Sequence, residues 1–215
     1  MRDLGIADER YFRHAMRSVF ACLYGELAIR YSMTEMKMEK FSLANRLPAH
    51  DPSFCQITEH SMFICGGLKR GVKHQLSDYA GIFDYDTNTL HSLQLMPSPK
   101  YRHCVVGVGS FVFSLGGSVQ HGIESKVCER YDLNAKTWSS IASMHLDRVL
   151  PKACVSFASH LLYVFVGAVQ KQDNCMIERY QIGRDMWSTL KVKLPEPFKN
   201  TLSFCVMISG GVHIN

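Results

Sequence analysis

Cysteine and histidine are the residues of this chain with the widest chemical scope, since both bind metals and both serve in nucleophilic catalysis. The 215 residues include eight cysteines and ten histidines. Zinc sites need such residues in close pairs at fixed spacing, but the chain contains no CxxC, HxH or HExxH. The sequence therefore predicts no metal site and no cofactor. Without a secretory signal, we expect the thiols to be reduced and the protein to be cytoplasmic.

Motifs for covalent or phosphate chemistry are also missing from the sequence. There is no GxSxG nucleophile elbow and no phosphate-binding P-loop. The glycines between residues 107 and 117 lead into strand-like segments, so no helix N-terminus follows them that could bind a phosphate. The sequence accordingly predicts no catalytic residue.

Two tyrosine–tryptophan pairs can be interpreted either as a ligand cage or as packing residues. Trp138 follows Tyr131 by seven residues, and Trp187 follows Tyr180 by the same interval. Because the spacing recurs, we expect these rings to pack between repeated units rather than to bind a ligand. The Glu-Arg dipeptides just before the two tyrosines are expected to make polar contacts between units, not acid–base catalysis.

The elements that position these residues are short strands. Residues 101–138 read as two apolar runs joined by a Gly109-Ser110 turn, then a third strand, a tight polar connection and a fourth strand. Such alternation of strand and turn signals is typical of a four-stranded antiparallel sheet.

This unit is repeated at steps of about 50 residues. Each copy is expected to place a cysteine near the start of its innermost strand, at Cys55, Cys104, Cys154 and Cys205. A glycine pair follows each of the first three cysteines, at Gly66-Gly67, Gly116-Gly117 and Gly167-Ala168. The tyrosine positions are then Tyr85, Tyr131 and Tyr180, with Leu90 in the place of the first tryptophan.

The order of double glycine, tyrosine and tryptophan resembles the kelch repeat, in which each repeat is one blade of a β-propeller. The resemblance covers residues 28–215 and implies an all-β fold of about four blades. Whole blades are expected at about 51–95, 102–144 and 152–194, with partial units at 29–47 and 198–215. The array is either a small ring closed by its end strands or, as we favour, part of a larger propeller. Four blades in an open arc would also leave strand edges available for self-association.

Residues 1–27 precede the repeats and are expected to form an amphipathic helix. Their apolar residues follow a helical period that starts at Phe12 and continues through Phe20 to Leu27. The helix is expected to pack on the edge of the propeller. The alternatives are a docking or dimerisation helix, or the remnant of an upstream helical domain.

The resemblance also points to a binding site. In kelch domains that bind acidic peptides, an arginine often stands just ahead of an inner strand, as Arg102 does here. Lys152 is taken as its equivalent in the next blade. Arg102, His103, Arg148 and Lys152 are therefore predicted to form a basic rim that binds carboxylates.

Two classes of function are compatible with the resemblance. We favour a non-catalytic scaffold or adaptor whose loops bind a protein, such as an acidic peptide, a cytoskeletal protein or a ubiquitin-ligase component. The segment before the repeats is expected to be too short to hold the BTB domain of ligase receptors. The alternatives are a carbohydrate enzyme like galactose oxidase or sialic-acid mutarotase, or a non-functional fragment of a longer kelch protein.

Composition adds little support for nucleic-acid or membrane partners. The net charge of +5 is mild and the charges are interleaved. The uncharged segment 153–169 is too short to span a membrane and is expected to be a buried hairpin.

Overall fold

The computed structural model describes residues 19–24, 27–32, 35–43, 47–120, 123–156, 160–165, 167 and 176–193. These residues form strands, turns and one short 3-10 segment, η2 (Ile182–Arg184), without an α-helix. No helix in this part of the chain is long and apolar enough to cross a membrane. The prediction of an all-β fold is confirmed.

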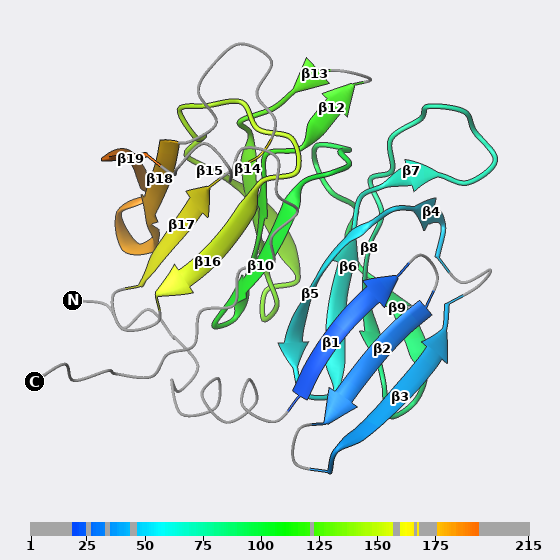
Figure 1. Ribbon diagram of the computed structural model, residues 1–215. Helices are drawn as coiled ribbons and strands as arrows, with labels where there is room; N and C mark the ends of the chain where they lie inside the picture. The colour runs from blue at the N-terminus through cyan, green and yellow to red at the C-terminus, as the bar shows by residue number, and fades with distance from the viewer. Residues whose placement is uncertain are drawn as a thin grey trace, which may run out of the picture.

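Three antiparallel sheets of four strands form most of the molecule (Figure 1). The first blade contains β5 (Ser53–Thr58), β6 (Ser61–Cys65), β8 (Ala80–Asp84) and β9 (Thr89–Ser92). The second blade contains β10 (Cys104–Val108), β11 (Phe111–Leu115), β14 (Cys128–Asp132) and β15 (Thr137–Ile141). The third blade contains β16 (Lys152–Ser156), β17 (Leu161–Phe165), β18 (Met176–Gln181) and β19 (Met186–Lys193). The uncharged segment thus includes the expected hairpin, β16–β17.

The three blades stand side by side, with the first strand of each toward the centre. β10 lies between β5 and β16, and the other strands follow outward in chain order. The hydrophobic core lies between successive sheets. One cluster joins the first and second blades through Phe63, Met96 and Tyr131, and another joins the second and third through Phe113 and Tyr180. Each blade therefore depends on its neighbour for burial of its faces.

A fourth sheet has three described strands, β1 (Val19–Tyr24), β2 (Leu27–Ser32) and β3 (Lys37–Ser42). The expected helix over residues 1–27 is wrong for residues 19–24, which pair with β2 instead; residues 1–18 lie outside the described part. The apolar residues of this segment fit a buried strand as well as a helical stripe, and tertiary pairing decides between them. This sheet packs on the first blade through Ala28, Leu43 and Phe83.

The strand registers correct one of the predicted tyrosine positions. Tyr131 pairs with Trp138 and Tyr180 with Trp187, whereas in the first blade Phe83 pairs with Leu90. Phe83, and not Tyr85, therefore holds the tyrosine position. Tyr85 was predicted at this position because of its residue type, but Phe83 is the residue at the same distance from the turn as Tyr131.

The partial unit that precedes the first blade follows the same register. Tyr31 pairs with Met38, again seven residues away, so β2 and β3 are the third and fourth strands of a blade. The tryptophan position of this unit is thus held by Met38. By the same correspondence, β1 is a second strand.

The backbone requires glycine at one position of the repeat, the second residue of each glycine pair. Gly67, Gly117 and Gly167 have φ values of 96°, 96° and 99°. Gly167 thus holds the place of the second glycine of each pair, rather than that of the first. A Cβ on Gly117 would lie 2.8 Å from the carbonyl oxygen of Tyr101, so a side chain cannot be accommodated there.

The cysteines do not all occupy one repeat position. Ser53, Cys104 and Lys152 each pair with the last residue of the adjacent second strand. Cys55 and Cys154 lie two residues further along, so Cys104 is displaced from them by two positions. Alternate residues of a strand share a face, and the small side chain is therefore kept on the same side of each inner strand. Cys205 lies outside the described residues.

Candidate functional site

One face of the molecule carries the longest loops. The described parts of the connections between second and third strands, and of those between blades, lie at this end of the sheets, which we call the loop face. Its loops contain four short strands: β4 (Ala49–His50), β7 (Leu68–Lys69), β12 (Ser118–Gln120) and β13 (Ile123–Glu124). In Figure 1 β12 and β13 lie at the top and β4 and β7 at the upper right, whereas the turn between β2 and β3 lies at the bottom. At the opposite end, called the turn face, the described connections are tight hairpin turns, such as Gly109-Ser110 between β10 and β11.

The first two loops have matching bases. The amide of Ser77 donates to the carbonyl of Gly67 at 2.8 Å, and that of Ser125 donates to Gly117 at 2.9 Å. Each serine hydroxyl then accepts a bond from the amide two residues on. Between these fixed bases the loops differ in length and sequence. A rigid base with a variable tip is typical of loops that recognise a partner.

Three residues at the entry to the inner strands adopt a left-handed backbone. Asp51, Arg102 and Leu150 have φ values of 48°, 55° and 55° and occupy equivalent positions, one residue before a proline or histidine. All three side chains are exposed. Non-glycine residues pay roughly 1–2 kcal/mol for this conformation. The loop face thus presents an acid, a base and an aliphatic side chain at corresponding points.

The loop face also exposes apolar side chains. In the described part of the chain nine large hydrophobic residues are exposed. Six of them lie in the loops and connections of this face: Val72, Leu95, Val119, Ile123, Val127 and Leu150. One of them, Ile123, is at the tip of the β12–β13 hairpin with half of its surface accessible. Sequence reasoning identified the loops but missed these residues, since their exposure depends on the tertiary fold.

The predicted basic rim is not formed as expected. Arg102 is exposed, and its guanidinium lies 5.2 Å from the centre of the Tyr101 ring. Lys152 is half-buried in β16 and is not its equivalent, because the registers place Leu150 at that position. His103 and Arg148 are buried and engaged inside the molecule. Basic character alone could not distinguish these environments in the sequence.

His103 lies in a buried polar cluster. Its Nδ1 is 3.3 Å from the hydroxyl of Ser53, and its Nε2 is 3.3 Å from the thiol of Cys65. A cysteine beside a histidine can be a nucleophile, but only as a thiolate. Burial raises the pKa of Cys65 and holds the pKa of His103 well below its usual value. Both groups are therefore neutral, and the cluster links β5 and β6 of the first blade to the residue that precedes β10.

Arg148 forms one of two buried ion pairs that occupy equivalent positions. Its Nε lies 3.1 Å from Oε2 of Glu178, and Nζ of Lys100 lies 3.0 Å from Oε2 of Glu129. Each cation precedes a blade, and each glutamate belongs to that blade's third strand. The carbonyls of Lys100 and Arg148 also accept bonds from Gly67 and Gly117. These pairs link neighbouring blades rather than perform catalysis.

In the first blade, both charged residues of this ion pair are replaced by uncharged ones. The registers place Ala49 and Gly81 where the other blades have cation and glutamate. A Cβ on Gly81 would lie 2.1 Å from the hydroxyl of Tyr79, so this ring takes the space of the missing side chains. Loss of both charges together is what electrostatics requires, because a single buried charge is costly.

The tyrosine–tryptophan pairs pack between blades, as expected from their recurrence. The indole nitrogen of Trp138 donates to the carbonyl of Gln94 at 2.9 Å, and that of Trp187 donates to Ala142 at 2.7 Å. Both acceptors follow the outer strand of the preceding blade. The rings are occupied by these contacts between blades and are not arranged as a ligand cage.

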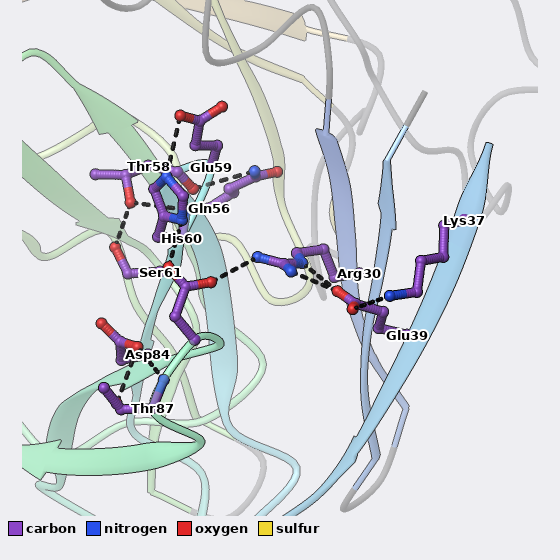
Figure 2. A network of polar contacts seen from close by, with 11 residues as sticks. Arg30, Lys37, Glu39, Gln56, Thr58, Glu59, His60, Ser61, Asp84 and Thr87 are labelled. Carbon is purple, nitrogen blue, oxygen red and sulfur yellow. Dashed lines mark hydrogen bonds and ion pairs between the residues drawn. The ribbon is translucent and has the colours of Figure 1, made fainter. Parts of the chain in front are cut away.

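The turn face is held by a polar network between the fourth sheet and the first blade. Figure 2 shows Arg30 of β2 between Glu39 of β3 and the turn that contains Asp86. The carboxylate of Asp86 also lies 2.6 Å from Nδ1 of His60. Lys37 extends the network to the edge of β3, 3.0 Å from Glu39. The network anchors neighbouring sheets, and Lys37, His60 and Asp86 remain exposed to solvent at its surface.

Metal-ligating groups and surface depressions are the features of the described residues that bear most directly on catalysis. These residues contain no group of three or more metal-ligating side chains. One depression of about 630 Å³ lies on the outer side of the first blade and is lined by Pro48, Tyr79, Asn88, Thr89, Leu90 and Ser92. This lining includes no carboxylate, histidine or thiol that could transfer a proton.

The fold is an array of four-stranded blades with exposed loops at one end, in which His103 and Cys65 are buried. No protein-family model matches the chain. It is 27% identical to human Kelch-like protein 38 over 172 residues, which are 79% of this chain and 29% of the relative. It is 29% identical to a RING finger domain and kelch repeat-containing protein of Dictyostelium discoideum over 101 residues, 46% of this chain and 10% of that protein. Kelch-like protein 36 of Bos taurus is 26% identical over 135 residues, covering 61% and 22%.

These matches and the repeated four-stranded sheets support the resemblance of the chain to kelch-repeat proteins. It spans less than a third of the length of these curated relatives.

Proposed function

We propose that the chain is a non-catalytic protein-interaction module that binds a protein partner through its loop face. The concentration of exposed apolar residues on this face carries the proposal. Clustered apolar surface on a folded protein marks an interaction site more often than scattered residues do. The names of the relatives, which include kelch-like proteins, are compatible with such a role.

The chemistry of the loop face indicates the kind of partner. Ile123 and Leu150 supply apolar contacts, and Arg102 supplies a cation held against the Tyr101 ring. The complementary surface is a protein segment with aliphatic side chains beside a carboxylate. A cytoskeletal protein or a ubiquitin-ligase component can provide such a segment. Cytoplasmic location is part of the proposal and rests on the sequence alone.

The proposal is tested with two matched pairs of substitutions. Ile123→Asp with Leu150→Asp alters the loop face, whereas Met36→Asp with Met186→Asp alters exposed residues of the turn face. Proteins that the wild-type chain captures from cells are identified, purified and titrated against all three forms by calorimetry. We expect the loop-face variant to bind at least tenfold more weakly, since two apolar contacts of about 1 kcal/mol or more each are lost.

The control variant is expected to bind within twofold of the wild type. Equal weakening by both variants, or unchanged binding by the loop-face variant, would contradict the proposal. Melting curves of all three forms exclude unfolding as the cause.

A further inference from the structure

The tryptophan position of the first blade is held by a much smaller side chain. In the second and third blades, Trp138 and Trp187 pack on the tyrosine opposite, with 5.2 and 4.9 Å between ring centres. Each indole also donates to the connection that follows the outer strand of the preceding blade. Leu90 takes this position in the first blade, opposite Phe83. A leucine has neither the area of an indole nor its N–H, so it cannot repeat this contact.

The depression on the outer side of the first blade lies beside this leucine, and we call it the Leu90 depression. Its volume of about 630 Å³ is within the ~300–1,000 Å³ that is typical of ligand sites. Phe41 of β3 does not line it, because its ring packs on Phe83 and Tyr85 at 5.7 and 5.4 Å, toward the turn face. The surface beside the leucine therefore stays open, whereas an indole covers the corresponding surface of the other two blades.

The backbone beside the depression carries a donor that no described residue accepts. Leu93 donates to the carbonyl of Ala80 at 2.9 Å, so these opposed residues are a hydrogen-bonded pair of the antiparallel ladder. Such pairs alternate with pairs whose backbone groups point outward, and by this count the N–H of Leu90 points away from β8. In the second blade the equivalent N–H, that of Trp138, donates to Oε1 of Gln94 at 3.0 Å. Within the described part of the chain, the N–H of Leu90 has no such acceptor.

We propose that the Leu90 depression binds a tryptophan side chain carried by a polypeptide segment of a partner. The indole takes the place on this blade that Trp138 and Trp187 take on the other two. A main-chain carbonyl of the segment accepts from the N–H of Leu90, as Gln94 accepts from Trp138. A strand edge that makes main-chain bonds, combined with a pocket for one side chain, is a recurring mode of peptide recognition.

The size and position of the depression support a polypeptide ligand. A volume of about 630 Å³ leaves room for the residues on either side of the tryptophan as well as for its ring. Pro48 and Tyr79 supply apolar lining near the loop-face end, and Ser92 supplies an exposed hydroxyl. The site lies along β9, on the outer strand of the blade, so it is distinct from the tips of the loop face.

The proposal is tested by titration of the full chain, labelled with nitrogen-15, with the capped peptide acetyl-Ala-Ala-Trp-Ala-Ala-amide. Backbone amide shifts are followed by nuclear magnetic resonance. We expect saturable shifts centred on residues 88–92, with at least fivefold tighter binding than for the same peptide with leucine in place of tryptophan, because an indole buries more apolar area. Equal affinity for the two peptides, shifts centred elsewhere, or no saturable shift at millimolar peptide overturns the proposal.

Two substitutions occupy the site from within the chain. Leu90→Trp restores the indole of the other blades, and Ser92→Arg adds a long side chain at an exposed residue of the lining. Each is expected to weaken peptide binding at least tenfold. The matched control Leu95→Trp adds the same ring at an exposed leucine outside the lining and should bind within twofold of the wild type. Undiminished binding by a folded blocking variant rules the site out; if Leu90→Trp does not fold, Ser92→Arg and the shifts of the wild type still decide.

Two further titrations identify the source of the ring and separate this site from the loop face. Free indole is expected to bind at least fivefold more weakly than the peptide, because it has no carbonyl to accept from Leu90. Equal or tighter binding of indole assigns the site to a small molecule and overturns the polypeptide ligand. The variant Ile123→Asp with Leu150→Asp should keep its affinity for the peptide; a loss of binding would place the peptide on the loop face and overturn the proposal.

Discussion

The buried ion pair between Arg148 and Glu178 offers a quantitative test of how the blades hold together. Both side chains are fully buried, with Nε of Arg148 3.1 Å from Oε2 of Glu178. Arg148 also donates to the carbonyl of Met176 at 2.6 Å, and Glu178 accepts from the amide of His145 at 2.6 Å. Burial lowers the pKa of Arg148, and the adjacent Glu178 opposes that shift. Removal of either partner therefore leaves the other charge buried without compensation and destabilises the fold.

Glu178→Gln keeps the shape of the side chain but leaves the guanidinium without an anion. Breaking a buried pair in this way costs about 3–5 kcal/mol, a large share of the ~5–15 kcal/mol that holds a typical domain folded. Replacing both residues, with Arg148→Met and Glu178→Gln, removes both charges. We expect the double variant to lose about 2 kcal/mol less than the sum of the single variants, in the range of coupled neighbouring residues. The first blade supports this expectation, since Ala49 and Gly81 replace both charges together.

Urea unfolding followed by tryptophan emission measures these differences. Trp187 belongs to the same cluster between the second and third blades, so Trp138→Phe leaves a single reporter at this interface. The control is Lys37→Gln, which disrupts an exposed pair with Glu39 and should cost less than about 1 kcal/mol. A loss below about 1 kcal/mol for Glu178→Gln, the level of an exposed pair, or additive single and double variants, would refute the reasoning.

Three further predictions concern stability and reactivity. Burial holds the pKa of His103 well below that of an unfolded histidine, so the unfolded state binds more protons below about pH 6.5. The free energy of unfolding therefore falls by up to ~1.4 kcal/mol per pH unit from there down to the folded pKa. Urea unfolding at pH 7.5 and 5 should show a smaller fall in this free energy for His103→Asn than for the wild type. Burial raises the pKa of Cys128 to about 12, so native protein at pH 8 should leave this thiol unmodified by iodoacetamide while urea exposes it; equal labelling in both would contradict its burial. Leu150→Gly relieves the strain of a left-handed backbone and should stabilise the fold by up to ~1 kcal/mol in thermal melts, while weakening partner binding. Clear destabilisation would contradict this, because it would show that contacts of the leucine side chain outweigh the backbone strain.

The repeat architecture could be predicted because each blade carries the same local signals. Gly67 and Gly117 mark a backbone conformation that other residues rarely adopt, and Trp138 and Trp187 stand at a fixed distance from a tyrosine. Such constraints are local, so they can be read without a structure. The correction of Tyr85 to Phe83 shows the limit: residue identity misled where the distance to the turn would have been right.

The binding residues were harder to predict because they depend on environment rather than on type. His103 and Arg148 have the same basic character as Arg102, yet only Arg102 reaches the surface. The buried partner of Arg148 is 30 residues away in another strand. Residues such as Ile123 resemble core residues in the sequence, and only the hairpin that carries them shows that they are exposed.

The N-terminal segment shows a different limit. Its apolar spacing suits a helix, but residues 19–24 pair with β2 instead. A short apolar run can satisfy either period, and the choice is made by the sheet that it joins.

The central claim is that the loop face, and not the turn face, binds a protein partner. Calorimetric titration of a purified partner against the wild type, the loop-face variant and the turn-face variant tests it most directly. The claim predicts at least tenfold weaker binding for Ile123→Asp with Leu150→Asp and unchanged binding for Met36→Asp with Met186→Asp. The reverse pattern would contradict it, because it would place the partner on the opposite end of the blades.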